Sequence, residues 1–210
     1  MIKNIIFDFD GVILDSVPTK TEAFKKLFED FPRNLVDKLI YYHKMNGGKS
    51  RYIKIKYFFN ELLNKDISEQ EILQYANKYS EITKEELTNP KYLIEDTVNF
   101  IKLNYREYNM HIASGADEMD LKYICNMLNL TKYFLSINGS PTVKSEIIKN
   151  ILELNTYNKD ETILIGDSIN DYKSAKKNII EFYGYNNLNL KIHFKYLLSF
   201  KEFNKKLRNS

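Results

Sequence analysis

The sequence predicts an α/β fold in which a parallel sheet has helices on both faces and a small four-helix bundle is inserted after the first strand. Two apolar runs, residues 5–7 and 163–165, are each followed by glycine and aspartate, which is typical of central strands in parallel sheets. Residues 16–86 show helical periodicity without a convincing strand. Helices and strands alternate from residue 87 onward, which indicates repeated α/β units.

The elements follow from this pattern in order. After the strand at residues 5–7, a helix runs through residues 17–31 until Pro32 interrupts it. Three further helices of the insertion are expected at residues 35–40, 53–63 and 72–82, with a Gly-Gly break before the second of them. The later elements are a helix at 93–103, strands at 111–113, 134–137 and 162–165, and helices at 121–128 and on both sides of the last strand. We therefore expect a core of residues 1–15 and 87–210 and a helical domain of residues 16–86.

Aspartates follow both apolar strands. Asp8 and Asp10 come after the first strand, and Asp167 and Asp171 come after the strand at residues 163–165. Parallel sheets build their sites at the carboxyl ends of their strands, and carboxylates held out of water need a cation. Mg²⁺ prefers oxygen ligands, whereas the three His and one Cys show no zinc-site spacing. The sequence predicts a hard divalent metal near Asp8, Asp167 and Asp171.

Two further features lie between these acids. Ser114 and Gly115 follow the strand at 111–113, and a hydroxyl beside backbone N–H groups can hold a phosphoryl oxygen. Lys144 stands just ahead of a predicted helix, where it could neutralise a phosphoryl group and a nearby carboxylate. Taken singly, the Ser-Gly pair also fits an ordinary turn and the lysine a solvated surface position.

The four motifs together, DFDGVILDS at 8–16, SG at 114–115, Lys144 and GDSIND at 166–171, resemble in order and spacing the haloacid dehalogenase-like superfamily. The resemblance implies a Rossmann-like core and an α-helical cap at residues 16–86. It implies that Asp8 is the nucleophile and Asp10 the general acid/base. It also implies that Ser114, Gly115 and Lys144 bind the phosphoryl group. The implied Mg²⁺ ligands are Asp8, the backbone carbonyl of Asp10, Asp167 and Asp171.

Elementary chemistry agrees with phosphate transfer. A phosphate dianion repels an anionic nucleophile, so a metal and Lys144 must offset the charge before Asp8 attacks. The resulting aspartyl-phosphate divides one difficult displacement into two easier ones. Asp10 can protonate the leaving alkoxide and then activate water. Because a halide leaves without a proton, Asp10 favours phosphate chemistry over dehalogenation.

The Gly-Gly segment of the helical domain is a candidate for reading the substrate. Glycines let backbone approach a ligand, and Gly48, Arg51 and Lys54 could contact the part of the substrate that does not react. The competing interpretation is a helix-helix turn with solvated charges. Asp15 and Ser16 are interpreted as a hinge and a helix N-cap.

The leading hypothesis is a Mg²⁺-dependent phosphatase that acts on a small phosphorylated metabolite, such as a sugar phosphate, an amino-alcohol phosphate or phosphoglycolate. The helical segment, GGKSR in particular, resembles that of metabolite phosphatases, by analogy with which its pathway would be one of carbohydrate or surface-glycan metabolism. A phosphomutase of the β-phosphoglucomutase type would use the same residues, and a non-catalytic binding subunit would keep the fold without the chemistry. The motifs do not separate these alternatives or identify the substrate.

Composition limits the partners. The net charge of +3 is small and the lysines alternate with acidic residues and Asn, so a nucleic-acid partner is not expected. No apolar run approaches the length of a membrane span, and no secretory signal is evident. The single Cys125 excludes an internal disulfide. We expect a cytoplasmic monomer or weak homodimer with no membrane partner.

Overall fold

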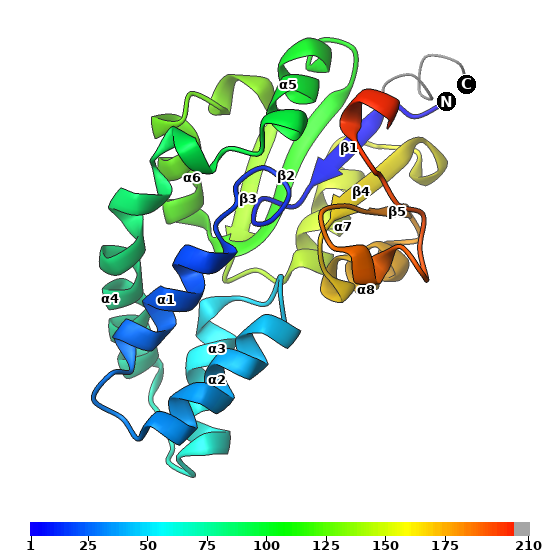
Figure 1. Cartoon of the computed structure of the whole chain (residues 1–210). Helices are drawn as coiled ribbons and strands as arrows, with labels where there is room; N and C mark the ends of the chain where they lie inside the picture. Colours follow the sequence, from blue (N-terminus) through cyan, green and yellow to red (C-terminus); the bar gives the residue numbers. More distant parts are fainter. Residues whose placement is uncertain (204–210) are drawn as a thin grey trace.

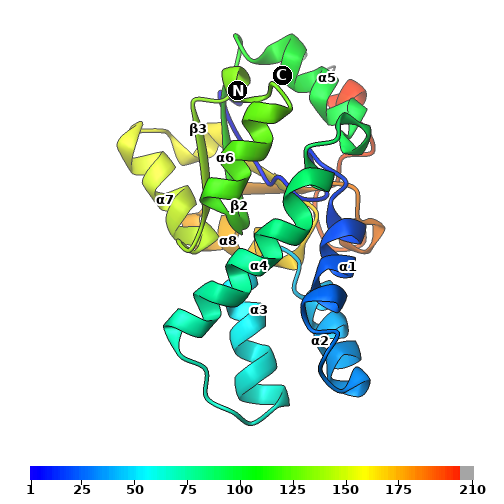
Figure 2. The same cartoon turned by 90° about the vertical axis from the view of Figure 1, so that its left-hand side faces the viewer.

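A computed structural model of the chain, described here for residues 1–203, contains two lobes (Figures 1 and 2). One lobe is built on a five-stranded parallel sheet, whose strand order is β3-β2-β1-β4-β5. The strands are β1 (Asn4–Phe7), β2 (Asn109–Asp117), β3 (Ser136–Ser140), β4 (Thr162–Gly166) and β5 (Glu181–Gly184). The predicted parallel α/β fold is confirmed, whereas β5 was not predicted as a strand.

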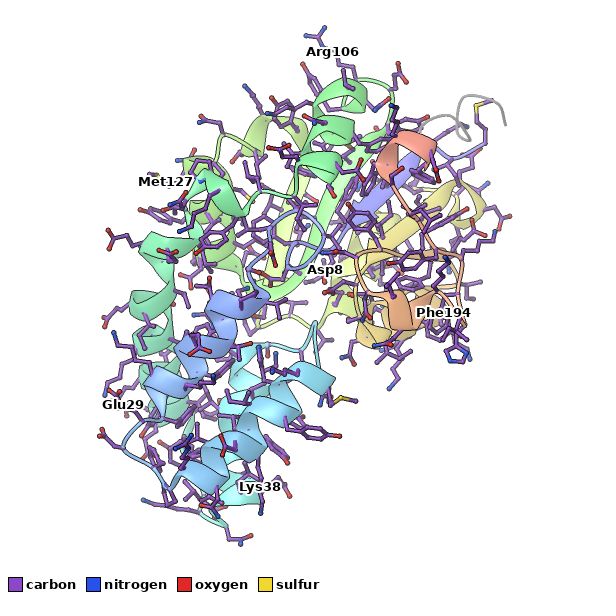
Figure 3. All side chains as sticks on the ribbon, viewed as in Figure 1. Asp8, Glu29, Lys38, Arg106, Met127 and Phe194 are labelled. Atoms are coloured by element: carbon purple, nitrogen blue, oxygen red, sulfur yellow. The ribbon has the colours of Figure 1, made fainter. Side chains whose placement is uncertain are left out.

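The central strand β1 sets the position of the site. All four of its residues are buried, and its apolar run pairs with β2 on one side and β4 on the other. Phe7 is in register with Ile112 of β2 and with Ile165 of β4. β1 and β4 therefore end at nearly the same level, whereas β2 continues past them to Asp117, and Asp8 follows Phe7 at that edge (Figure 3).

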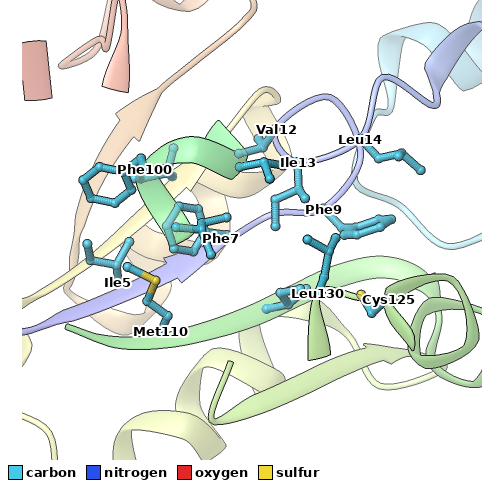
Figure 4. Packing of buried hydrophobic residues seen from close by; sticks show 14 of the residues in the cluster. Ile5, Phe7, Phe9, Val12, Ile13, Leu14, Phe100, Met110, Cys125 and Leu130 are labelled. Atoms are coloured by element: carbon cyan, nitrogen blue, oxygen red, sulfur yellow. The ribbon is translucent and has the colours of Figure 1, made fainter. Parts of the chain in front are cut away.

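Helices cover both faces of the sheet because successive strand residues point to opposite sides. Ile6 packs with α7 (Lys144–Leu154) and α8 (Ile169–Asn178). Ile5 and Phe7 pack on the other face with α5 (Glu95–Asn104) and α6 (Glu118–Met127) (Figure 4). This two-sided burial explains why the first strand is apolar at every position from Ile5 to Phe7.

The second lobe, here called the helical lobe, consists of α1 (Val17–Leu27), α2 (Arg33–Met45), α3 (Arg51–Tyr57), a π-helical turn (Phe58–Leu62) and α4 (Glu69–Leu87). The first helix ends before Pro32, which stands at the N-cap of α2. The helical lobe has its own aromatic core, in which the Phe28 ring lies 4.2 Å from the Phe58 ring and 5.5 Å from the Tyr75 ring, centroid to centroid. In the described part of the chain, no helix is long and apolar enough to cross a membrane.

Polar contacts join the two lobes. The Arg51 guanidinium in α3 pairs with Asp120 of α6 at 2.6 Å, and the Tyr52 hydroxyl donates to Asp117 at 2.6 Å. A Cβ placed on Gly115 would lie 2.2 Å from the carbonyl oxygen of Gly48. The loop before α3 therefore rests directly on the end of β2.

The separate aromatic core gives a stability prediction. Phe28→Ala removes a fully buried ring and is expected to lower the free energy of unfolding by about 3–5 kcal/mol, because it leaves a cavity among Phe58 and Tyr75. Urea denaturation followed by circular dichroism measures the change. Tyr41→Ala, at a position 70% exposed in α2, is the control and should change stability by less than about 0.5 kcal/mol. Equal losses in both variants would contradict an independently packed helical core.

Candidate active site

Three carboxylates meet at the carboxyl edge of the sheet. Asp8 follows β1, Asp167 follows β4, and Asp171 lies in the first turn of α8. One oxygen from each lies within 4.8 Å of the others. The structure thus brings together Asp8 and the two acids of the second predicted motif, which are about 160 residues away in the chain.

Glycines make this close approach possible. Gly11 has φ +76°, and a Cβ there would lie 2.1 Å from a side-chain oxygen of Asp167. A Cβ on Gly166 would lie 2.4 Å from the Asp171 Cβ. A larger residue at either position would have to displace a carboxylate of the cluster, so these glycines are needed for close approach as well as for turning the chain.

Lys144 lies against the cluster from the first position of α7. Its Nζ is 2.8 Å from Asp8 Oδ1 and also bonds Asp171 Oδ1, and the residue is only 6% exposed. The other oxygen of Asp171 accepts from the Ser168 backbone N–H at 3.0 Å and from its hydroxyl at 2.6 Å. Ionised, the three carboxylates and Lys144 leave two uncompensated negative charges, which matches the charge and the oxygen preference of Mg²⁺.

The pKa values in the cluster reflect this crowding. Burial, and then the nearby charge of Asp171, raise the pKa of Asp8 to about 7, although Lys144 acts in the opposite direction. Burial and the charge of Asp8 likewise raise the pKa of Asp167 well above its usual value. A bound divalent cation would favour the ionised forms, because it supplies the positive charge that the cluster lacks.

Ser114 and Gly115 lie in the last part of β2, in the segment that continues beyond the end of β1. Ser114 is fully buried, and its Oγ accepts from the Ala116 backbone N–H at 3.1 Å. Accepting this bond leaves the hydroxyl hydrogen able to donate elsewhere. The register of β1 with β2 places Ser114 close to the level of Asp8, as a phosphoryl-binding hydroxyl would need.

Asp10 lies outside the carboxylate cluster. Its carboxylate accepts from Lys20 Nζ at 2.5 Å and from Ser16 Oγ at 2.5 Å. Burial would raise the pKa of Asp10, but the charge and hydrogen bond of Lys20 outweigh burial and lower it. In this arrangement Asp10 is therefore a carboxylate, the form that accepts a proton.

These contacts correct one interpretation and add one residue. Ser16 stands at the N-cap of α1, but its side chain makes no capping bond and instead holds Asp10. Lys20 was missed because no motif marks it. Its approach to Asp10 depends on how α1 folds back over the turn that follows β1, which residue spacing does not reveal.

A cavity of about 460 Å³ lies between the lobes. Asp10, Asp167 and Gly115 line it from the sheet lobe, and the predicted residues Gly48, Arg51 and Lys54 line it from the helical lobe. The segment after β5 also contributes, through Asn187, Asn189, Leu190, His193 and Phe194. Sequence reasoning missed this segment because it carries no recognisable motif.

The helical-lobe residues differ in how they are bonded. Arg51 also donates to Ser80 Oγ at 2.6 Å and to the Ala76 carbonyl at 3.1 Å, so its guanidinium is held in place. Lys54 is 5% exposed, and its Nζ lies 3.0 Å from His43 Nδ1. His43 was not predicted; it lies on α2, and only packing brings it to α3.

Comparisons with known proteins agree with this geometry. A family model described as "Haloacid dehalogenase-like hydrolase" matches residues 5–185. Phosphoglycolate phosphatase 1 of Pseudomonas aeruginosa is 23% identical over 197 residues, which cover 87% of this chain and 70% of the relative.

Two solved structures share the whole architecture. β-Phosphoglucomutase from Clostridium difficile matches with a TM-score of 0.77 at 18% identity, over 100% of this chain and 98% of that one. The magnesium-bound HAD-hydrolase YfnB from Bacillus subtilis matches with a TM-score of 0.71 at 19% identity, over 99% of both chains.

The family model spans most of the chain, and the fold matches the solved members from end to end. The predicted family, the Rossmann-like fold and the assignment as an enzyme are therefore confirmed. The chain belongs to the haloacid dehalogenase-like hydrolase family, as an enzyme similar to the family's phosphatases.

Proposed function

We propose that this enzyme is a Mg²⁺-dependent phosphatase that hydrolyses a small-metabolite phosphate monoester through an aspartyl-phosphate on Asp8. The observation that carries the proposal is the buried group of Asp8, Asp167 and Asp171 with Lys144, which lacks two positive charges. Residues 1–15 and 87–210 would form the catalytic core, and residues 16–86 the cap.

The comparisons support the reaction class. The curated relative is named a phosphoglycolate phosphatase, and one structural neighbour binds magnesium. The cavity volume of about 460 Å³ suits a small metabolite, which supports the expected partner. We further propose that the enzyme is a cytoplasmic monomer or weak homodimer without nucleic-acid or membrane partners.

The first half-reaction uses Asp8 as nucleophile. Lys144 holds Asp8 in place and offsets part of its charge, while the Ser114 hydroxyl and the Gly115 N–H orient the phosphoryl oxygens. Bound Mg²⁺, held by Asp8, Asp167 and the Asp10 carbonyl, would supply the remaining positive charge. Asp171 would act chiefly by positioning Lys144, since Lys144 and Ser168 already bond both of its oxygens. To bind the metal directly, Asp171 would have to give up one of these two partners.

The second half-reaction uses Asp10. Held by Lys20 and Ser16 as a carboxylate, Asp10 is in the protonation state that activates water against the aspartyl-phosphate. Its earlier role as an acid requires a proton, so the contact with Lys20 must loosen before the leaving oxygen is protonated. Lys20 would therefore regulate the protonation state of Asp10.

The similarity to β-phosphoglucomutase favours one alternative. A phosphomutase would transfer the phosphoryl group from Asp8 to a second hydroxyl of a sugar instead of to water. Incubation with β-glucose 1-phosphate separates the two functions, because a phosphatase releases inorganic phosphate and a mutase forms glucose 6-phosphate without release.

The nucleophile is tested by Asp8→Asn. We expect phosphate release to fall at least about a thousandfold, since an amide does not attack phosphorus. The thermal midpoint should be unchanged or raised, because the substitution removes one crowded charge. Asp15→Asn, at an exposed position in the same loop, is the control and should retain activity. Phosphate release from Asp8→Asn at the wild-type rate would exclude Asp8 as the nucleophile.

The metal is tested by removing and restoring it. EDTA should abolish phosphate release, measured colorimetrically over a panel of sugar, amino-alcohol and short-acid phosphates, and excess Mg²⁺ should restore it. Full activity in EDTA-treated, metal-free protein would contradict the proposed cofactor.

The metal site also predicts a pH dependence of stability. Burial and Asp171 raise the pKa of Asp8 from 3.8 to about 7, so the folded chain binds more protons than the unfolded chain between these values. This contribution to the stability of the metal-free protein is present below about pH 4 and is lost as the pH rises through 7. Thermal melts should show that Mg²⁺ raises the midpoint more at pH 8 than at pH 5. The opposite order would contradict a carboxylate site.

A further inference from the structure

Lys54 is a buried cation without a carboxylate partner. Two other basic residues of the cavity wall are paired: Lys20 binds Asp10 at 2.5 Å and Arg51 binds Asp120 at 2.6 Å. Of the remaining two lysines that line the cavity, Lys44 is exposed and Lys49 donates to the Tyr42 hydroxyl. Lys54 is only 5% exposed, and among residues 1–203 it forms no ion pair. A buried ammonium without a counter-charge is unfavourable for folding, so its position calls for an explanation.

The neighbour of Lys54 cannot balance its charge. Burial, and then the charge of Lys54, lower the pKa of His43 to about 3, so the ring is neutral. Since Nδ1 accepts from the ammonium at 3.0 Å, the ring hydrogen lies on Nε2. Nε2 is buried and has no partner in the described part of the chain. The pair therefore has unused hydrogen-bond donors on both residues.

The surroundings of the pair strengthen any ion pair formed there. The Phe24 ring lies 5.0 Å from the His43 ring and 6.0 Å from Lys54 Nζ, and the Tyr79 ring lies 4.6 Å from the Phe24 ring, centroid to centroid. All four side chains line the cavity. In such an apolar setting an opposite charge on a ligand interacts more strongly than it would in water.

The pair is also close to the reacting groups. Burial, and then the charge of Lys20, lower the pKa of Lys54 to about 7, whereas Asp10 and Asp167 raise it. Asp10 and Asp167 therefore act electrostatically on Lys54, although Lys54 belongs to the helical lobe. Lys54 also lines the same cavity as Asp10 and Asp167, so a short molecule with its phosphoryl group at the catalytic edge would have Lys54 on the helical-lobe side of the cavity.

We propose that Lys54, together with His43, binds a carboxylate on the leaving group of the substrate, so that the enzyme selects phosphate esters of short hydroxy acids. This inference rests on the proposed function. A carboxylate matches the single unpaired charge of Lys54, whereas a second phosphate dianion would bring two negative charges. Amino-alcohol phosphates are disfavoured, because their ammonium group would face Lys54. Arg51, already bonded to Asp120, Ser80 and Ala76, holds the lobes together.

The experiment compares three phosphate esters that differ only at the end distant from phosphorus: phosphoglycolate, 2-hydroxyethyl phosphate and O-phosphoethanolamine. They carry a carboxylate, a hydroxyl and an ammonium. Phosphate release is measured for the wild type, for Lys54→Met, which keeps the length of the side chain, and for Lys56→Met, an exposed control on the same helix. Release from 4-nitrophenyl phosphate reports the proposed function by itself.

The wild type should prefer phosphoglycolate. Lys54→Met should lower kcat/KM for phosphoglycolate by about 30–100-fold, mostly through KM, because one charge-assisted hydrogen bond is lost. It should change kcat/KM for 2-hydroxyethyl phosphate by less than about threefold. It should raise kcat/KM for O-phosphoethanolamine, since the repulsion between the two ammonium groups is removed. Lys56→Met should match the wild type with all three esters.

Two results of the kinetic comparison would overturn the proposal. Equal losses for all three esters in Lys54→Met would assign Lys54 a structural role, and a wild type without preference for the carboxylate would exclude the recognition. If 4-nitrophenyl phosphate and all three esters are left intact, the proposed function fails. Titration calorimetry then measures carboxylate binding at Lys54 independently of turnover. In Asp8→Asn with Mg²⁺, adding Lys54→Met should weaken phosphoglycolate binding about 30-fold, and an unchanged Kd would overturn it.

Discussion

The buried contact of Lys144 with Asp8 and Asp171 is the interaction on which the rest of the site depends. Three carboxylates at one sheet edge repel one another, and burial makes that repulsion stronger. A single ammonium between two of them reduces the repulsion without removing it. The remaining negative charge makes the edge suited to a divalent metal and a phosphoryl group, neither of which an electrically balanced cluster would attract.

Close packing follows from this constraint. Gly11 and Gly166 lie so near Asp167 and Asp171 that neither position has room for a Cβ. Gly115 likewise lets the helical lobe approach, because the Gly48 carbonyl oxygen occupies the space that a Cβ at position 115 would fill. The glycines thus bring the chain against the carboxylates on one side and the helical lobe against β2 on the other, which encloses the cavity between them.

Three basic residues that line the cavity differ in their bonding partners. Lys20 is engaged with Asp10, and Arg51 is engaged with Asp120 across the lobes. Lys54 has only a neutral histidine beside it. Of these three residues, Lys54 is able to gain most from an incoming anion, since Lys20 and Arg51 would first have to break an existing ion pair.

The sequence by itself determined the family, the parallel sheet and the residues of the carboxylate edge, because strand periodicity is local and carboxyl ends of parallel strands meet at one edge. It also placed Ser114 and Lys144 next to that edge through their order in the chain. Only the tertiary structure decided the partners: Lys20 and Ser16 on Asp10, Asp120 on Arg51, and His43 on Lys54. Those contacts depend on how the helices of a separate lobe rotate and pack, and the same helical pattern is compatible with many such arrangements. The strand β5 and the cavity segment after it were missed for a related reason, since a short edge strand carries little periodic signal and gains its place from pairing with β4.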